Sequence, residues 1–267
     1  MEDKIILDEF LLKSDNDIKK VYEIIKNDYH KNSINYMSSN DSQLFDYSYE
    51  YDYEKKVLKN NIVRFSYFGT KIRFLDNFDL FFDQSFLEKL KTKYELYKDN
   101  LKEDFVTFSF SFLDGKLNDI KLYFDVIVSE NMKFNKFDEI LFKRTKNEIV
   151  LISFSLNKNG ISEEKMYFPI NSFIKKLGNE VLKNNLLYKK FEKYKPFDIL
   201  FRYKNDKIST IKYYYYKEEN KEIEKEIENY FSGILIPKVD NIKEEIGIDF
   251  SLDGGIKKIN YYISQYK

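Results

Sequence analysis

Four segments of this 267-residue chain share one pattern: IKLYF (120–124), EKMYF (164–168), IKYYY (211–215) and INYYI (259–263). Each has a lysine or asparagine followed two positions later by tyrosine, and KIRFL (71–75) is a fifth copy with leucine in place of tyrosine. The copies recur at intervals of about 44–48 residues, which is typical of a repeat architecture. Because residues i and i+2 of a strand point to the same face, each lysine and its tyrosine share a face.

Each of these segments is the return strand of a predicted hairpin. The first strands alternate apolar residues with serine, as in FSFSF (108–112), and the turns DGK, NKNG, KNDK and DGG have the residues that tight hairpins require. The five predicted hairpins are VRFSYFGTKIRFL (63–75), FSFSFLDGKLNDIKLYF (108–124), LISFSLNKNGISEEKMYF (151–168), ILFRYKNDKISTIKYYYY (199–216) and IDFSLDGGIKKINYYIS (248–264). The pattern therefore predicts a sheet with one apolar and one polar face.

Helical patterns separate the hairpins, most clearly at 83–103, 170–194 and 217–231. The first has an apolar stripe and a charged face, and such helices could cover the apolar face of the sheet. The charged run within 217–231 is interpreted as an exposed helix face. Residues 1–60 are predicted to be an N-terminal helical extension, with a helix at 15–30. Within it, DYSYEYDYEKK (46–56) is interpreted as a loop or helix, with a lid or a contact surface as alternatives.

Ten antiparallel strands would leave two edges in an open sheet, whereas closure removes both and leaves room for a lumen. We therefore expect an α+β fold in which a ten-stranded antiparallel β-barrel has its polar face inside and its helices outside. The chain is expected to be one domain over 1–267, with hairpin repeats near 61–82, 104–128, 148–169, 197–216 and 246–265.

Over residues 60–264 this arrangement resembles the ABBA, or PT-barrel, family of soluble aromatic prenyltransferases, whose fold is five α-β-β-α repeats closed into such a barrel. The resemblance rests on IKLYF, EKMYF, IKYYY and KINYYIS (258–264) and on repeat order and spacing. It implies an enzyme that transfers an allylic isoprenoid from its diphosphate to an aromatic small molecule, as in secondary metabolism. Because Arg64 stands where metal-dependent members have a Mg²⁺-binding aspartate, magnesium, metals and other cofactors are not expected to be required.

The resemblance also assigns roles to residues of the polar face. Tyrosine faces would stabilise the carbocation, lysine and arginine would hold the diphosphate, and small polar residues would line the acceptor pocket. The catalytic tyrosines would be Tyr123, Tyr167, Tyr214 and Tyr262; the diphosphate ligands Arg64, Arg73, Lys121, Lys165, Arg202, Lys212 and Lys258; and the acceptor pocket Ser66, Ser111, Ser155 and Asn260. A register shifted by one residue would instead present Lys257 and Tyr261. The general base is not identified, and Asp249 is only a candidate.

Composition limits the other possibilities. Lysine plus arginine equal aspartate plus glutamate at 45 each, so no bulk positive field would attract nucleic acid or a membrane surface. The chain has no cysteine and no apolar run of membrane-spanning length, so a cytoplasmic monomer is expected. The single histidine, His30, is interpreted as an ordinary helix residue. Two alternatives to the enzyme stay open: a noncatalytic barrel that binds an anionic amphiphile or a protein partner, and an open array of helix-hairpin repeats that serves as a scaffold.

Overall fold

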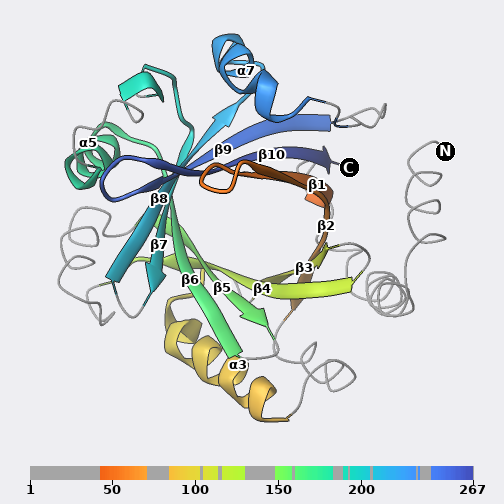
Figure 1. Cartoon of the computed structure of the whole chain (residues 1–267). Helices are drawn as coiled ribbons and strands as arrows, with labels where there is room; N and C mark the ends of the chain where they lie inside the picture. Colours follow the sequence, from red (N-terminus) through yellow and green to blue (C-terminus); the bar gives the residue numbers. More distant parts are fainter. Residues whose placement is uncertain are drawn as a thin grey trace.

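The structure is a computed structural model, and it describes residues 43–70, 84–102, 105–113, 116–129, 148–157, 160–182, 189–191, 193–204, 207–232, 234 and 242–266. Ten strands form one antiparallel sheet (Figure 1). They are β1 (Gln43–Asp52), β2 (Val57–Thr70), β3 (Phe105–Leu113), β4 (Lys116–Ile127), β5 (Ile149–Asn157), β6 (Gly160–Pro169), β7 (Asp198–Lys204), β8 (Lys207–Tyr216), β9 (Ile242–Ser251) and β10 (Ile256–Tyr266). The helices are α3 (Gln84–Tyr97), α5 (Ser172–Val181) and α7 (Lys221–Ile227), with the 3-10 helices η3 (Lys98–Asn100) and η4 (Glu228–Tyr230).

The sheet closes on itself through β1. The strands follow one another in the order β1, β10, β9 and so on down to β2, and β1 pairs with both β10 and β2. Ser48 of β1, for example, lies opposite Tyr262 on one side and Ile62 on the other. In Figure 1 the strands form a ring in which β1 lies between β2 and β10. The ring therefore has an inner and an outer face.

Four hairpins carry a β-bulge at the same place. Each return strand has one residue more than its partner there: Asn118 in β4, Ser162 in β6, Ser209 in β8 and Lys257 in β10. A bulge increases the local twist and bend of a strand, and both favour closure of a sheet. Each bulge comes three residues before the lysine or asparagine of the sequence pattern. The backbone conformation therefore repeats together with the sequence.

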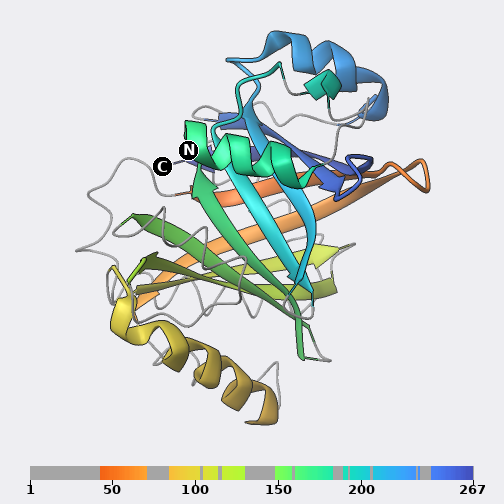
Figure 2. The ribbon, with the colours of Figure 1, turned by 90° about the vertical axis from the view of Figure 1, so that its left-hand side faces the viewer.

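The outer face is apolar, and helices cover it. The rings of Tyr94 and Tyr97 in α3 lie 6.0 Å from Phe124 and 5.9 Å from Phe154, on β4 and β5. Figure 2 shows α3 along this side of the barrel. Full burial of an aromatic or aliphatic side chain stabilises a fold by about 1.5–3 kcal/mol. Side chains one or three positions apart on a strand point to opposite faces. Since Phe124 points outward, Tyr123 and Lys121 of the same strand point inward.

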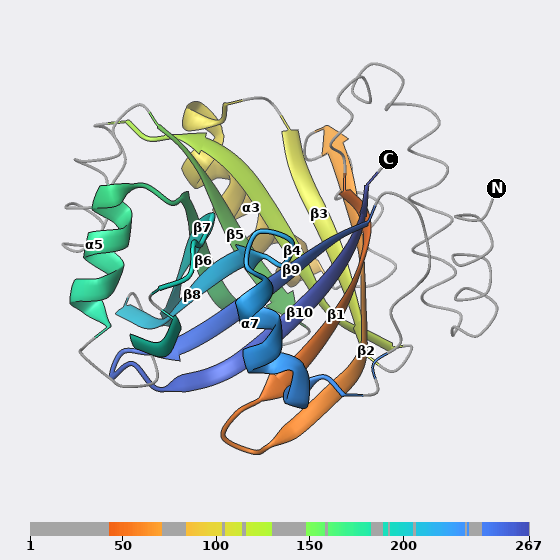
Figure 3. The same cartoon turned by 90° about the horizontal axis from the view of Figure 1, so that it is seen from above.

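The other two helices pack in the same way. Helix α5 approaches β7 and β8 so closely that a Cβ atom on Gly178 would lie 2.3 Å from the hydroxyl of Tyr213. Helix α7 buries Ile223 and Ile227, and Phe231, just after η4, lies 5.6 Å from the ring of Tyr261 on β10. Figure 3 shows α5 and α7 outside the strands, on different sides of the ring.

The fold class expected from the sequence is wrong. A PT barrel has five α-β-β-α repeats and a full layer of outer helices, but the described residues contain only three short α-helices with defined bounds, of 14, 10 and 7 residues. These helices do not flank every hairpin on both sides. Within the described residues, the predicted stretch 83–103 contains α3 and η3, and the stretch 217–231 contains α7 and η4. The stretch 170–194 contains α5, and Phe191 and Tyr194 near its end also pack against the strands, at Phe250 and Tyr215.

The first predicted hairpin is also wrong. Residues 63–70 belong to β2, whose two edges are filled by β1 and β3, so β2 has no edge left for a return strand at 71–75. The first hairpin is β1–β2, and residues 43–60, which were expected to belong to a helical extension, form most of it. The stretch 46–56 is therefore strand and turn. The predicted helix at 15–30, together with His30 and Arg73, lies outside the described residues.

Gly178→Ala tests the close contact between α5 and the barrel. Alanine favours helix by about 1 kcal/mol over glycine, but overpacking a buried contact costs about 1–3 kcal/mol. Because the new methyl group would meet buried Tyr213 and Ile199, we expect a net loss of about 1 kcal/mol, measured by urea unfolding. Glu180→Ala, at an exposed position of the same helix, should change stability by less than about 0.5 kcal/mol. A Gly178→Ala protein as stable as the wild type would contradict this packing.

Candidate functional site in the barrel interior

The inner face of the sheet carries a layer of buried polar side chains. Its members are Ser48, Ser109, Ser111, Lys121, Ser153, Ser155, Lys165, Lys212, Asp249, Asn260 and Ser264. Burial of polar and charged groups is unfavourable unless they have hydrogen-bond or ion-pair partners. The partners of the charged members therefore define what this interior can do.

Glu163 of β6 joins two buried cations. Its Oε2 lies 2.8 Å from the Nζ of Lys165, and its Oε1 accepts a hydrogen bond from the Nη1 of Arg202 at 2.6 Å. Lys165 also donates to the hydroxyl of Ser155 at 2.8 Å. Glu163 and Lys165 are two residues apart on one strand, and Arg202 lies opposite Lys165 on β7. Strand geometry alone thus brings the three groups together.

Asp249 of β9 extends this arrangement to β8. One of its oxygens lies 3.2 Å from the Nη2 of Arg202 and the other 2.9 Å from the Nζ of Lys212. Lys212 donates further hydrogen bonds to the side-chain oxygen of Asn260 at 2.6 Å and to the hydroxyl of Tyr262 at 3.1 Å. We call Glu163, Lys165, Arg202, Lys212 and Asp249 the interior ion network. In it, three cations share two carboxylates.

The carboxylates of the network are strongly stabilised as anions. Burial alone would raise the pKa of Glu163, but Lys165 and Arg202 outweigh burial and hold that pKa far below its usual range. Burial likewise opposes ionisation of Asp249, and Arg202 and Lys212 still keep its pKa lowered. Both groups are therefore charged at neutral pH.

The surplus of positive charge falls on Lys165. Burial and the nearby Arg202 lower the pKa of Lys165 to about 8, although Glu163 acts in the opposite direction. Lys212 differs because Asp249 and the Tyr262 hydroxyl outweigh its burial, so its pKa is raised. An additional anion beside Lys165 would relieve the repulsion from Arg202.

The four tyrosines of the sequence pattern form a continuous column. The ring centroids of Tyr123 and Tyr167 are 6.2 Å apart, those of Tyr167 and Tyr214 are 6.1 Å apart, and those of Tyr214 and Tyr262 are 6.0 Å apart. Such separations are typical of attractive aromatic pairs. The Nζ of Lys212 lies 5.7 Å from the centroids of both Tyr214 and Tyr262. The lysines and phenols that the sequence places on one face therefore meet in space.

Small residues on the intervening strands make this column possible. Gly247 of β9 lies between Tyr214 and Tyr262, and a Cβ atom there would come within 3.1 Å of Tyr262 and of Lys212. Three of the tyrosines, Tyr123, Tyr167 and Tyr214, are only partly buried although they face inward. Each of these three residues therefore keeps some accessible surface.

The structure places the other predicted residues less uniformly. Lys258 pairs with Glu50 of β1 at 3.3 Å and is half-buried. By backbone register, Arg64 lies opposite Ser111 and Ser66 opposite Ser109, but their side chains are outside the described atoms. Ser155 and Asn260, which were expected to line an acceptor pocket, accept hydrogen bonds from Lys165 and Lys212. Tyr262 points into the barrel whereas Tyr261 contacts Phe231 outside, so the preferred register of this strand is confirmed.

Sequence reasoning missed the carboxylates that balance these cations. Glu163 precedes Lys165 by two residues, so the same i, i+2 rule that paired Lys165 with Tyr167 also placed Glu163 on the inner face. Glu50 was missed because its strand was not recognised. Asp249 was considered only as a candidate general base, whereas the structure makes it an ion-pair partner of Arg202 and Lys212.

One more acidic residue, outside the interior ion network, lies beside the tyrosine column. Asp198 of β7 is opposite Tyr214, and its side chain accepts a hydrogen bond from the backbone N–H of Ile199 at 3.0 Å. Burial raises the pKa of Asp198 well above its usual value; the Ile199 N–H opposes this shift and Glu245 adds to it. The interior therefore contains a carboxyl group that binds a proton more readily than an ordinary aspartate.

No protein-family model matches this sequence, and a comparison with curated protein sequences finds no significant match. The resemblance to prenyltransferases therefore depends only on the spacing and residue types described above.

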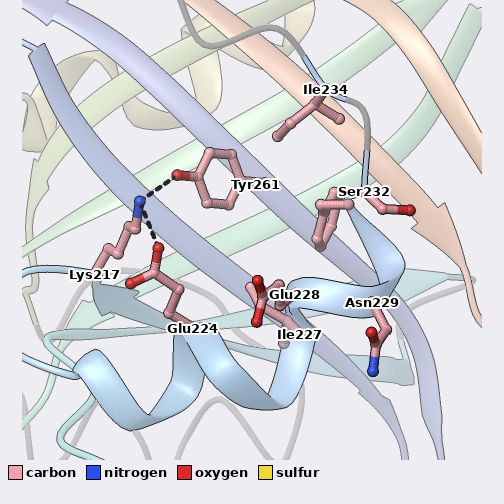
Figure 4. A pocket seen from close by; sticks show the side chains of 9 residues that line it. Lys217, Glu224, Ile227, Glu228, Asn229, Ser232, Ile234 and Tyr261 are labelled. Carbon is pink, nitrogen blue, oxygen red and sulfur yellow. Dashed lines mark hydrogen bonds and ion pairs between the residues drawn. The ribbon is translucent and has the colours of Figure 1, made fainter.

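A separate hollow of about 480 Å³ lies outside the barrel, beside α7 and η4 (Figure 4). Its lining includes Ile227, Phe231 and Tyr261 together with the charged residues Lys217, Glu224 and Glu228. Lys217 lies 3.0 Å from Glu224 and donates to the Tyr261 hydroxyl at 3.0 Å. None of the predicted site residues lines this hollow.

Within the described ranges, no group of three or more histidine, aspartate or glutamate side chains is arranged to hold a metal ion. The helices described here also include none with the length and apolarity needed to cross a bilayer.

Two matched substitutions test the electrostatics of the interior, and we expect one to lower the stability of the fold and the other to raise it. Asp249→Asn leaves Arg202 and Lys212 incompletely paired, which costs about 3–5 kcal/mol for a buried pair. Asp198→Asn removes a carboxylate that is unfavourable when ionised and keeps its acceptor oxygen, so it should raise the melting temperature by about 2–4 °C, the shift that corresponds to roughly 1 kcal/mol. Thermal unfolding at pH 7 measures both.

The pH dependence provides the control for this pair. The lowered pKa of Asp249 means that its stabilisation is present above the unfolded pKa of about 4 and is lost as the pH falls through the folded value. The raised pKa of Asp198 means that its penalty is full above the folded value and absent below about 4. The gain from Asp198→Asn should therefore shrink between pH 7 and pH 4. Equal effects of the two substitutions at pH 7 would contradict the assignment.

Proposed function

We propose that this protein is a noncatalytic barrel that binds an anionic amphiphile inside. The headgroup would lie at the interior ion network, and the body of the ligand would lie along Tyr123, Tyr167 and Tyr214. The observation that carries this proposal is the surplus of cations in the interior ion network: among the residues that the structure describes, Lys165, Arg202 and Lys212 form their ion pairs with two carboxylates, Glu163 and Asp249. Asp119 also acts on Lys165, and Lys121 lies opposite Ser155, the acceptor of a hydrogen bond from Lys165, so these two residues add one charge of each sign.

Two further features support an anion at this place. Arg202 Nε and Thr210 Oγ1 are buried without a hydrogen-bond partner among the described residues, and Arg202 and Thr210 lie opposite each other on β7 and β8. A buried N–H and a buried hydroxyl with no partner each cost about 1–3 kcal/mol, so an oxygen-rich headgroup would stabilise both. Charge-assisted hydrogen bonds to lysine and arginine are the strongest that a carboxylate or phosphate can accept.

The tyrosine column explains why an amphiphile fits better than a small inorganic anion. Three of its residues are only partly buried, and a phenol ring is apolar with a polar hydroxyl at one end. Each CH₂ that a ligand buries contributes about 0.8 kcal/mol. The chain as a whole has no net charge, so the anion site is a local feature of the interior. A cytoplasmic setting, consistent with the lack of cysteine, is part of this proposal.

A second candidate is the aromatic prenyl transfer expected from the resemblance, with a prenyl diphosphate and an aromatic acceptor as partners and no magnesium requirement. One observation favours it: Lys212 stands between the rings of Tyr214 and Tyr262, where cation and phenol groups would hold a diphosphate beside an allylic cation. Asp198, opposite Tyr214, is then the base that the sequence did not identify. Product formation from geranyl diphosphate and a panel of phenols and indoles, with and without EDTA, tests this candidate.

Thermal shift and calorimetry with dodecyl phosphate, dodecanoate and dodecanol test the binding proposal. The two anions should raise the melting temperature and dodecanol should not, since ligand binding stabilises by RT ln(1 + [L]/Kd). Lys165→Met should weaken anion binding at least tenfold, or about 1.4 kcal/mol. The matched control is Lys217→Met, which removes an ion-paired lysine outside the barrel and should leave binding unchanged. Equal shifts of the melting temperature with dodecanol and with the anions would refute the proposal.

A further inference from the structure

The two carboxylates of the interior ion network differ in their exposure to solvent. The Asp249 side chain is 3% exposed, whereas the Glu163 side chain is 32% exposed. Both carboxylates contact two cations of similar burial: the side chains of Lys165, Lys212 and Arg202 are 6%, 5% and 15% exposed. Glu163 is thus the one anion of the network that borders open space.

Glu163 also uses both of its oxygens as a bound headgroup would. Oε1 pairs with Arg202 Nη1 at 2.6 Å, and Oε2 pairs with Lys165 Nζ at 2.8 Å. A ligand carboxylate has the same pair of oxygens, and a phosphate monoester has a third oxygen and a larger negative charge. Glu163 follows the bulge at Ser162, where the regular pairing of β5 and β6 is interrupted.

We infer that Glu163 occupies the headgroup position of the ligand and competes with it, so that this residue sets the affinity and specificity of the barrel for carboxylate and phosphate heads. This inference rests on the binding function proposed above. Binding would transfer the Lys165 and Arg202 donors from the Glu163 carboxylate to the headgroup, while Glu163 turns toward solvent. Asp249 stays in place and keeps Arg202 and Lys212 paired.

Glu163→Gln in the full-length protein tests the inference by calorimetric titration with dodecyl phosphate and dodecanoate. Removal of the competing charge should tighten binding of both anions at least tenfold, and dodecyl phosphate should gain more than dodecanoate because of its third oxygen. Glu164→Gln is the matched control, since Glu164 is the next residue on the same strand but faces outward, where it accepts from the Tyr97 hydroxyl at 3.4 Å. It should bind like the wild type.

The possible results distinguish competition by Glu163 from the anion-binding function itself. If wild type binds the anions and Glu163→Gln binds them equally or more weakly, Glu163 is a supporting residue and the competition is refuted, while the binding function stands. If no form of the protein binds either anion, the proposed function itself is refuted. Glu163→Asp, which keeps the charge but shortens its reach, gives a second folded variant, and we expect its affinity to lie between those of wild type and Glu163→Gln.

Discussion

The guanidinium of Arg202 contacts both carboxylates of the interior ion network, and the connection of this network across the strands depends on it. Through Glu163 it is joined to Lys165, and through Asp249 it is joined to Lys212, so four neighbouring strands from β6 to β9 meet at one side chain. The planar fork of arginine suits this role because it can serve two acceptors at once and does not lose its proton. Lysine at this position would supply a point charge to one of them.

The same contact explains why the interior is unevenly charged. Each lysine has one close carboxylate, and Arg202 lies near both lysines. The pKa of Lys212 is nevertheless raised, because Asp249 and the Tyr262 hydroxyl outweigh its burial, whereas the pKa of Lys165 is lowered by burial and by Arg202. The barrel thus holds its strands together with ion pairs and still keeps one cation incompletely balanced. On the outer side, apolar contacts between helices and strands provide the stability that permits this polar interior.

Much of the interior could be predicted because strand side chains alternate with a period of two. The rule that placed Lys121, Lys165 and Lys212 with their tyrosines predicted a column that the ring distances now measure. The same rule was not applied to Glu163, or to the stretch 45–52, where aromatic and polar residues alternate perfectly but the acidic, tyrosine-rich composition suggested loop or helix. That omission misplaced the first hairpin, although β1 is the strand that joins β2 to β10.

Other features could not be predicted from the sequence. The bulges at Asn118, Ser162, Ser209 and Lys257 leave no mark in a period-two pattern, because they shift the pairing and not the residue types. The extent of the helices was overestimated because amphipathic spacing shows that a helix can form, whereas its ends depend on contacts with the strands. The five-repeat helical shell was then supplied by the family resemblance, which the spacing of lysines and tyrosines alone does not justify.

A crystal structure of the protein with dodecyl phosphate would test the central claim most directly, because it shows where an anion binds when both the interior and the outer hollow are available. The account predicts the phosphate inside the barrel, within hydrogen-bond distance of Lys165 Nζ and Arg202, with the alkyl chain against Tyr167 and Tyr214 and the Glu163 carboxylate displaced. A phosphate bound only outside the ring, or an interior in which Glu163 and Lys165 stay paired at saturating ligand, would contradict it.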